Sequence, residues 1–173
     1  MFVLLTGGND SGKSRCAERI ASQVESRRFY AATMVPWGAE GEARKAKHIR
    51  QRAGLNFVTV ECPRDLSAVP CGLGDLALLE DVSNLLANLT FEGGCDDPEG
   101  EAFAQVLDLR DRCSTLLAVT IGGLSPTGDE RTQEYVRSLN RLNARLAEAA
   151  DVVVQMREHV PYVVKGVCRW ELV

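Results

Sequence analysis

The stretch of this sequence that most restricts its fold is the octapeptide GGNDSGKS at residues 7–14. It follows the apolar run of residues 2–5 and precedes residues 13–24, whose apolar side chains recur at helical spacing. The spacing G-x-x-x-x-G-K-S/T between a strand and a helix is typical of a loop whose consecutive N–H groups hold phosphate, assisted by the helix dipole. The sequence therefore predicts a strand, an anion-binding loop and a helix in succession.

The residue types of this glycine loop, residues 7–14, indicate a nucleoside triphosphate, ATP or GTP. Lys13 is expected to reach the β- and γ-phosphates as a point charge, and the Ser14 hydroxyl is expected to complete a Mg²⁺ shell. We expect the nucleotide to contact Gly7, Gly8, Asn9, Asp10, Ser11, Gly12, Lys13 and Ser14.

Apolar runs alternate with helix-like stretches along the rest of the chain, which predicts the α/β class. The runs occupy residues 2–6, 28–33, 57–61, 76–80, 116–121 and 152–155. We predict a P-loop NTPase-type three-layer sandwich with a mostly parallel central sheet, formed as a single nucleotide-binding domain over residues 1–173. Residues 152–170 place two apolar runs around a short polar turn, which predicts an antiparallel hairpin at one sheet edge.

Two further segments carry local signals. Residues 91–100 combine glycine, proline and acidic residues and are predicted to form a loop. Residues 135–149 are apolar on one helical face, and Thr127 with Glu130 has the spacing of a capping box for that helix, with Asp129 adding favourable charge at its start.

Glu80 and Asp81 end the apolar run of residues 76–80. A carboxylate at the end of a second strand can reach the Mg²⁺ of a phosphate-loop site directly or through water, so Glu80 is the predicted second metal ligand beside Ser14. Asp81 can instead cap the helix that follows, and both roles are compatible.

The chain has two histidines. His48 lies among arginines and lysines at residues 44–52, where a charge run usually marks a solvated helix face. A neutral imidazole among cations is also a good nucleophile at phosphorus, so His48 remains a candidate catalytic residue. His159, in the predicted hairpin, is interpreted as structural, and the arginines at 137, 141 and 145 as an outer helix face or subunit contact.

The composition limits the classes of partner. A net charge of −4 gives no cationic footprint, so we expect neither nucleic acid nor a membrane as partner. The sequence has no apolar span of about 20 residues and no signal-peptide core, which favours a cytoplasmic protein. The six cysteines form no C-x-x-C pair and are expected to be reduced thiols.

Taken together, the motifs resemble the bifunctional adenosylcobinamide kinase / adenosylcobinamide-phosphate guanylyltransferase family of cobalamin assembly. Only the glycine loop is specific by itself, and the resemblance depends on the order and spacing of all the segments. These are TGGNDSGKSRCAE, YAAT, KAKHIRQR, TVEC, LLEDVSNLLANL and LNARLAEAADVVV.

The resemblance implies an enzyme with two steps and a corrinoid substrate. A nucleoside triphosphate phosphorylates adenosylcobinamide, and a histidine then takes GMP from GTP and passes it to the new phosphate. His48 matches that histidine. The family forms homotrimers, so the resemblance implies a homotrimer for this chain. The positions that match nucleotide contacts of the family are Ala32, Thr33, Arg50, Arg52, Glu61 and Glu80.

The sequence departs from the family at Asp10, Ile49 and Ala53, where the family commonly has Arg, Arg and Pro. Residues 119–126 lack an expected Asn-Glu pair, and residues 134–138 lack a Phe-Arg-Asp. Two alternatives therefore stay open: a kinase for a different small-molecule hydroxyl, and a non-catalytic protein that responds to nucleotide binding.

Overall fold

A computed structural model describes residues 1–36 and 38–173, apart from the side chains of five residues in the second helix, Glu40, Arg44, Lys47, His48 and Gln51. The strands are β1 (Phe2–Gly7), β2 (Arg28–Ala32), β3 (Phe57–Glu61), β4 (Leu76–Glu80), β5 (Thr115–Ile121), β6 (Val152–Arg157) and β7 (Val160–Lys165). The helices are α1 (Lys13–Ser22), α2 (Gly38–Gln51), α3 (Val82–Phe91), α4 (Pro98–Arg112), α5 (Glu130–Ala149) and the short 3-10 helix η1 (Leu66–Ala68).

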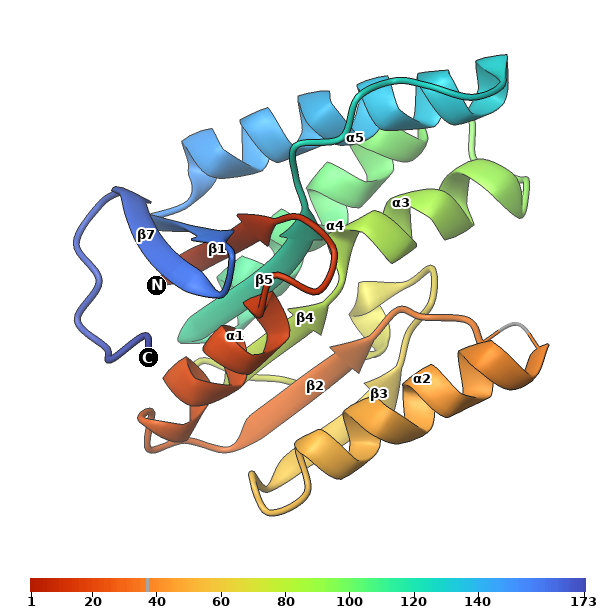
Figure 1. Cartoon of the computed structure of the whole chain (residues 1–173). Helices are drawn as coiled ribbons and strands as arrows, with labels where there is room; N and C mark the ends of the chain where they lie inside the picture. The colour runs from red at the N-terminus through yellow and green to blue at the C-terminus, as the bar shows by residue number, and fades with distance from the viewer. Residues whose placement is uncertain (37) are drawn as a thin grey trace.

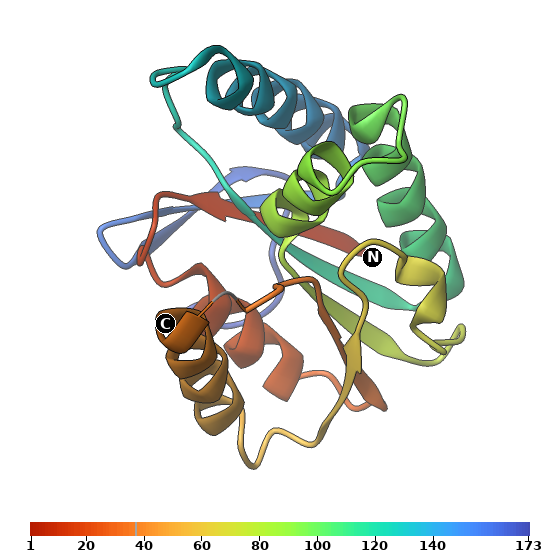
Figure 2. The same ribbon diagram turned by 90° about the vertical axis from the view of Figure 1, so that its right-hand side faces the viewer.

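The strands form one seven-stranded sheet in the order β3-β2-β4-β5-β1-β6-β7. All neighbouring pairs are parallel except β6 and β7, which form the antiparallel edge hairpin predicted from residues 152–170. Helices α1 and α2 cover one face of the sheet, and α3, α4 and α5 cover the other (Figures 1 and 2). The predicted three-layer α/β architecture is therefore confirmed, and the ends of the predicted strands shift only slightly.

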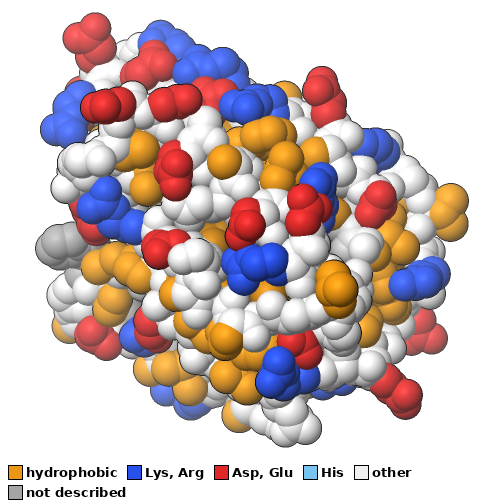
Figure 3. Space-filling view, turned by 180° about the vertical axis from the view of Figure 1, so that it is seen from behind, with side chains coloured by type: hydrophobic (Ala, Val, Ile, Leu, Met, Phe, Trp, Pro, Cys, Tyr) orange, Lys and Arg blue, Asp and Glu red, His pale blue; other side chains and the backbone are white. Residues whose placement is uncertain are grey.

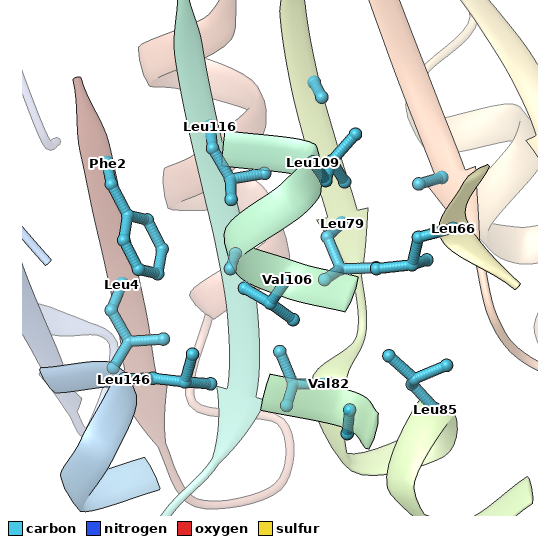
Figure 4. Close-up of a cluster of buried hydrophobic side chains, with 14 of the residues drawn as sticks. Phe2, Leu4, Leu66, Leu79, Val82, Leu85, Val106, Leu109, Leu116 and Leu146 are labelled. Carbon is cyan, nitrogen blue, oxygen red and sulfur yellow. The ribbon is translucent and has the colours of Figure 1, made fainter. Parts of the chain in front are cut away.

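The central strands are buried on both faces, and successive residues of β1 enter different cores. Phe2 and Leu4 pack with α3, α4 and α5, whereas Val3 and Leu5 pack with α1. Figure 4 shows the larger core, in which leucines from the strands meet those of the helices. Parallel strands covered on both faces read as continuous apolar runs, which is why they could be located from the sequence.

Two local predictions were wrong at helix starts. The cap of α5 is Asp129 and not Thr127, because the Asp129 Oδ1 atom accepts a hydrogen bond from the Thr132 N–H at 2.9 Å. The predicted loop at residues 91–100 is also shorter than expected. Pro98 begins α4, and Asp97 caps it by accepting a hydrogen bond from the Gly100 N–H at 3.0 Å. Proline fits the first turn of a helix, where its missing N–H would have had no partner.

The α5 cap gives a test that separates the two candidate positions. Replacing Asp129 with alanine removes an N–H partner at the helix start and is expected to lower the free energy of unfolding by about 1 kcal/mol. Replacing Thr127 with alanine is the matched control and is expected to change it by less than about 0.5 kcal/mol. Urea denaturation of both variants measures the difference, and a larger loss in the Thr127 variant would contradict the observed cap.

On the face shown in Figure 3, lysine and arginine side chains are interspersed with aspartate and glutamate, so this face has no large patch of one charge. Arg141 and Arg145 of α5 pair with Glu99 of α4 at 2.8 and 3.4 Å, which agrees with their interpretation as an outer helix face. Among the helices in the described part of the chain, none is long and apolar enough to cross a membrane.

Candidate active site

The glycine loop leaves the carboxyl end of β1 and turns directly into α1. Gly12 has a φ of 91°, in the left-handed region that favours glycine, and it precedes α1 with no side-chain cap. Lys13 folds back over the loop, and its Nζ atom donates to the Gly8 carbonyl at 2.5 Å. Among the described residues, no main-chain hydrogen bond to the N–H groups of Gly12, Lys13 and Ser14 is seen. These donors at a helix start form the anion-binding nest that the motif predicts.

This nest opens into a cavity of about 1150 Å³ at the carboxyl end of the parallel strands. Strands β1 and β4 both contribute to it: only β5 separates them in the sheet, and all three are parallel, so the loops after them lie at the same edge. Its lining includes residues 9–15, Tyr30, Ala32, Lys45, Arg52, Glu61, Glu80, Asp81 and His159.

Ser14 and Glu80, the two predicted metal ligands, are in direct contact. The Ser14 hydroxyl donates to the Glu80 Oε1 atom at 2.6 Å. The second carboxylate oxygen of Glu80, Oε2, is buried and has no hydrogen-bond partner among the described residues. Hard oxygen donors are the ligands that Mg²⁺ prefers, so this pair fits a magnesium ion bound beside the phosphates.

The burial of the site changes the acidity of its charged groups. Burial raises the pKa of Glu80 to about 8, and the neighbouring Asp81 adds to the shift, against the Ser14 hydrogen bond. Burial also raises the pKa of Asp81 and lowers the pKa of Lys13, although the carboxylates of Asp81, Glu80 and Asp10 oppose the shift at Lys13. A bound cation would favour ionised Glu80, so the site is chemically suited to take up a metal together with an anionic ligand.

Asp81 and Thr33 have structural roles at the rim of the site. The Asp81 carboxylate caps α3 by accepting from the Asn84 N–H at 2.7 Å, which confirms the helix-cap interpretation. The Thr33 hydroxyl donates to the Asp81 carbonyl at 2.8 Å and accepts from the Asp81 N–H at 2.7 Å. Thr33 is fully buried and holds the β4–α3 connection in place, while its role in nucleotide binding stays a prediction.

Arg52 is a buried residue of the cavity lining. Its guanidinium carbon is 3.7 Å from the centroid of the Tyr30 ring, a cation–π arrangement, and the side chain is 8% exposed. Glu18 of α1 is also buried. Burial raises the pKa of Glu18, and the charge of Arg52 opposes this shift without cancelling it. Arg52 therefore connects the segment after α2 to β2 and α1, and it presents its remaining surface to the cavity.

Helix α2 covers the outer side of the cavity. Lys45 pairs with Glu61 at the end of β3, with 3.0 Å between Nζ and Oε1, and both line the cavity with Ala32. Arg50 is exposed on α2 and lies outside that lining. The predicted nucleophile His48 belongs to α2, but its side chain lies outside the described part of the structure.

The remaining residues of the glycine loop divide into two groups. The cavity is lined by Asn9, Asp10, Ser11 and Gly12. Asp10 is exposed, and its backbone has a φ of 52°. Gly7 and Gly8 are not among the lining residues. A Cβ atom at Gly7 would lie 2.6 Å from the Met156 carbonyl oxygen, so β6 leaves room only for glycine at that position.

His159 is a site residue that the sequence interpretation missed. It was expected to be structural, whereas it lies in the cavity lining beside Gly12. A Cβ atom at Gly12 would be only 3.2 Å from the His159 Nδ1 atom. The signal that could have located it is topological: β6 neighbours β1, so a turn after β6 lies beside the loop after β1.

The comparison with protein families agrees with this site. The pattern of the family described as cobinamide kinase / cobinamide phosphate guanyltransferase matches residues 3–164. The chain belongs to this family. This match confirms the resemblance stated from the motifs. The family consists of kinases and nucleotidyltransferases, which use nucleotides as substrates.

Individual relatives match over most of their length. The bifunctional adenosylcobalamin biosynthesis protein CobP of Pseudomonas aeruginosa is 32% identical, over 96% of this chain and 98% of its own. The bifunctional adenosylcobalamin biosynthesis protein CobU of Salmonella typhimurium is 29% identical, over 88% of this chain and 93% of its own. A solved ATPase of a bacterial type III secretion system has a TM-score of 0.51 and 12% identity, covering 89% of this chain and 50% of its own. That likeness supports the P-loop fold alone.

Proposed function

We propose that this protein phosphorylates adenosylcobinamide with ATP or GTP and then transfers GMP from GTP to adenosylcobinamide phosphate. The observation that carries the proposal is the joint position of Lys13, Ser14 and Glu80 in the lining of a large cavity. The family description names both activities, and relatives match over nearly their whole length. We also propose that residues 1–173 act as one P-loop domain, since all seven strands join one sheet.

In the proposed kinase step, the acceptor hydroxyl oxygen attacks the γ-phosphorus. The bond from that phosphorus to the β,γ-bridging oxygen breaks, and the hydroxyl proton leaves with a base or water. Lys13 and the N–H groups of the loop neutralise charge on the phosphates, which is the main contribution that phosphoryl transfer needs from a protein. Ser14 and Glu80 would hold Mg²⁺, whose charge would offset that of the β- and γ-phosphates.

In the proposed guanylyl step, an imidazole nitrogen of His48 attacks the α-phosphorus of GTP and pyrophosphate leaves. The phosphate of the corrinoid then attacks the same phosphorus, the P–N bond breaks, and the imidazole is released. Support for His48 comes from its match to the family's histidine and from the place of α2, whose Lys45 lines the cavity. The nucleotide contacts proposed at Ala32, Arg52 and Glu61 are supported in the same way, by their place in that lining.

Two further expectations, a homotrimer and a cytoplasmic location, stay predictions that follow from the family resemblance and the sequence. The two alternatives, a kinase with a different acceptor and a non-catalytic nucleotide-binding protein, are separated from the proposal by the experiment below.

The test uses GTP labelled at the α-phosphate. Incubation with the full chain and Mg²⁺ is expected to leave acid-labile, alkali-stable label on the protein, as a phosphorus–nitrogen bond would. The His48→Ala variant is expected to lose the label and to keep ATP-dependent phosphorylation of adenosylcobinamide. Lys165→Met, on β7 and outside the cavity lining, serves as the control and should retain the label. Label that persists in His48→Ala, or nucleotide binding without phosphorylation of adenosylcobinamide, would contradict the proposal.

A further inference from the structure

We propose that His159 binds the phosphate chain of the nucleotide, as a donor supplied to the glycine loop from the β6–β7 turn. The inference rests on the proposed nucleotide-dependent function and adds a positioning residue to its site. It follows from three features: the turn geometry at His159, its place beside the loop, and the charged groups of the cavity.

The turn between β6 and β7 holds His159 in a defined position. Arg157 pairs with Val160 across the hairpin, so Glu158 and His159 are the two central residues of the turn. Their φ angles are 49° and 66°, the left-handed values that a two-residue hairpin of this type requires at both positions. Histidine is one of the few residues other than glycine that adopts this region with some frequency. The strand pairing therefore limits where the imidazole can lie.

The register between β1 and β6 brings this turn against the glycine loop. Gly7 is paired with Met156, so β1 and β6 reach the cavity edge together. At Gly12, an added Cβ atom would lie 3.2 Å from the His159 Nδ1 atom and 3.8 Å from its Cα atom. The imidazole therefore lies beside the loop, one residue before Lys13 and close to the start of α1.

The acidic lining means that a bound triphosphate needs further hydrogen-bond donors from the cavity. The acidic residues of the cavity lining are Asp10, Glu61, Glu80 and Asp81, and a triphosphate brings several further negative charges. Two of the cations that could offset them already have partners. Lys45 pairs with Glu61, and Arg52 stacks on Tyr30. His159 adds a hydrogen-bond donor from the β6–β7 turn, which contributes no other described residue to the cavity lining.

The purine ring is the other part of a nucleotide that an imidazole could contact. We favour the phosphates because His159 lies beside Gly12, which is inside the phosphate-binding motif. An aromatic ring placed to stack on a base would instead be expected beyond the loop, away from the N–H groups of the nest.

The experiment compares His159→Gly with Glu158→Gly by calorimetric titration in the presence of Mg²⁺. Glycine adopts the turn conformation without strain at either position, so the backbone change is matched, and Glu158 lies outside the cavity lining. The ligands are ATP, GTP and inorganic tripolyphosphate, which has no base. We expect His159→Gly to weaken all three by about tenfold, as loss of one hydrogen bond to a charged group does, and Glu158→Gly to weaken none.

A further variant, His159→Asn, tolerates the left-handed backbone and retains an N–H donor, and should recover part of the lost affinity. Unchanged affinity in His159→Gly would overturn the inference. A loss confined to ATP and GTP, with tripolyphosphate unaffected, would also overturn it and would assign the imidazole to the base. The Lys13→Met variant separates the two levels of the argument. If it still binds nucleotide normally, the proposed function fails, whereas normal binding by His159→Gly alone removes only the role of His159.

Discussion

Replacing Lys13 with methionine is expected to lower kcat/KM for phosphorylation of adenosylcobinamide by about 10³-fold, the usual cost of removing one preorganised charge donor. Lys13 is 7% exposed and donates to the Gly8 carbonyl, so its ammonium is already held at the phosphate nest before any ligand binds. Methionine preserves most of the volume and the apolar contacts of the side chain. The loss therefore reports on the charge and not on packing.

The matched control is Lys165→Met, measured in the same steady-state assay. Lys165 lies on β7 and donates to the carbonyls of Ala147 and Glu148 at 2.9 and 2.7 Å, away from the cavity lining. We expect its kcat/KM to match that of the unmodified chain at temperatures well below unfolding. A Lys13 variant that kept kcat/KM within about tenfold would contradict the electrostatic role given to this residue.

Replacing Leu79 with alanine is expected to lower the free energy of unfolding by about 3 kcal/mol, within the range found for leucines in closely packed cores. Leu79 is fully buried in β4 and packs in the larger core, near Leu66 and Leu109 in Figure 4. Truncation removes apolar contacts and leaves a cavity that the surrounding strands and helices cannot fill. Its neighbour along the chain is Glu80, so the same strand supports the site.

The control for this variant is Leu73→Ala, since Leu73 is 81% exposed. We expect that change to alter the free energy of unfolding by less than about 0.5 kcal/mol. Urea denaturation followed by tryptophan fluorescence measures both, with equal slopes required for a valid comparison. A loss below about 1 kcal/mol for Leu79→Ala would show that the core around β4 relaxes more than close packing allows.

The sequence by itself determined the features that depend on nearby residues. The glycine loop was located because its function requires fixed residue types at fixed spacing. The buried parallel strands were located because they appear as continuous apolar runs. Glu80 could be paired with Ser14 because carboxyl ends of parallel strands share one edge, and the structure places their oxygens 2.6 Å apart. The cap of α5 was assigned to the wrong residue because Thr127 and Asp129 both offer side-chain acceptors near the helix start.

Only the tertiary structure decided what residues distant in sequence do at the site. The hydrogen bonds between the Thr33 hydroxyl and the main chain of Asp81 join segments 48 residues apart. Arg52 was assigned from the family resemblance, and its stacking on Tyr30 could not be inferred from either segment alone. His159 reached the glycine loop because β6 pairs with β1. Periodicity and motifs predict local structure, because they depend on residues close together in the sequence. The contacts above join distant segments and depend on the order of strands in the sheet, which is set by the packing of the whole molecule.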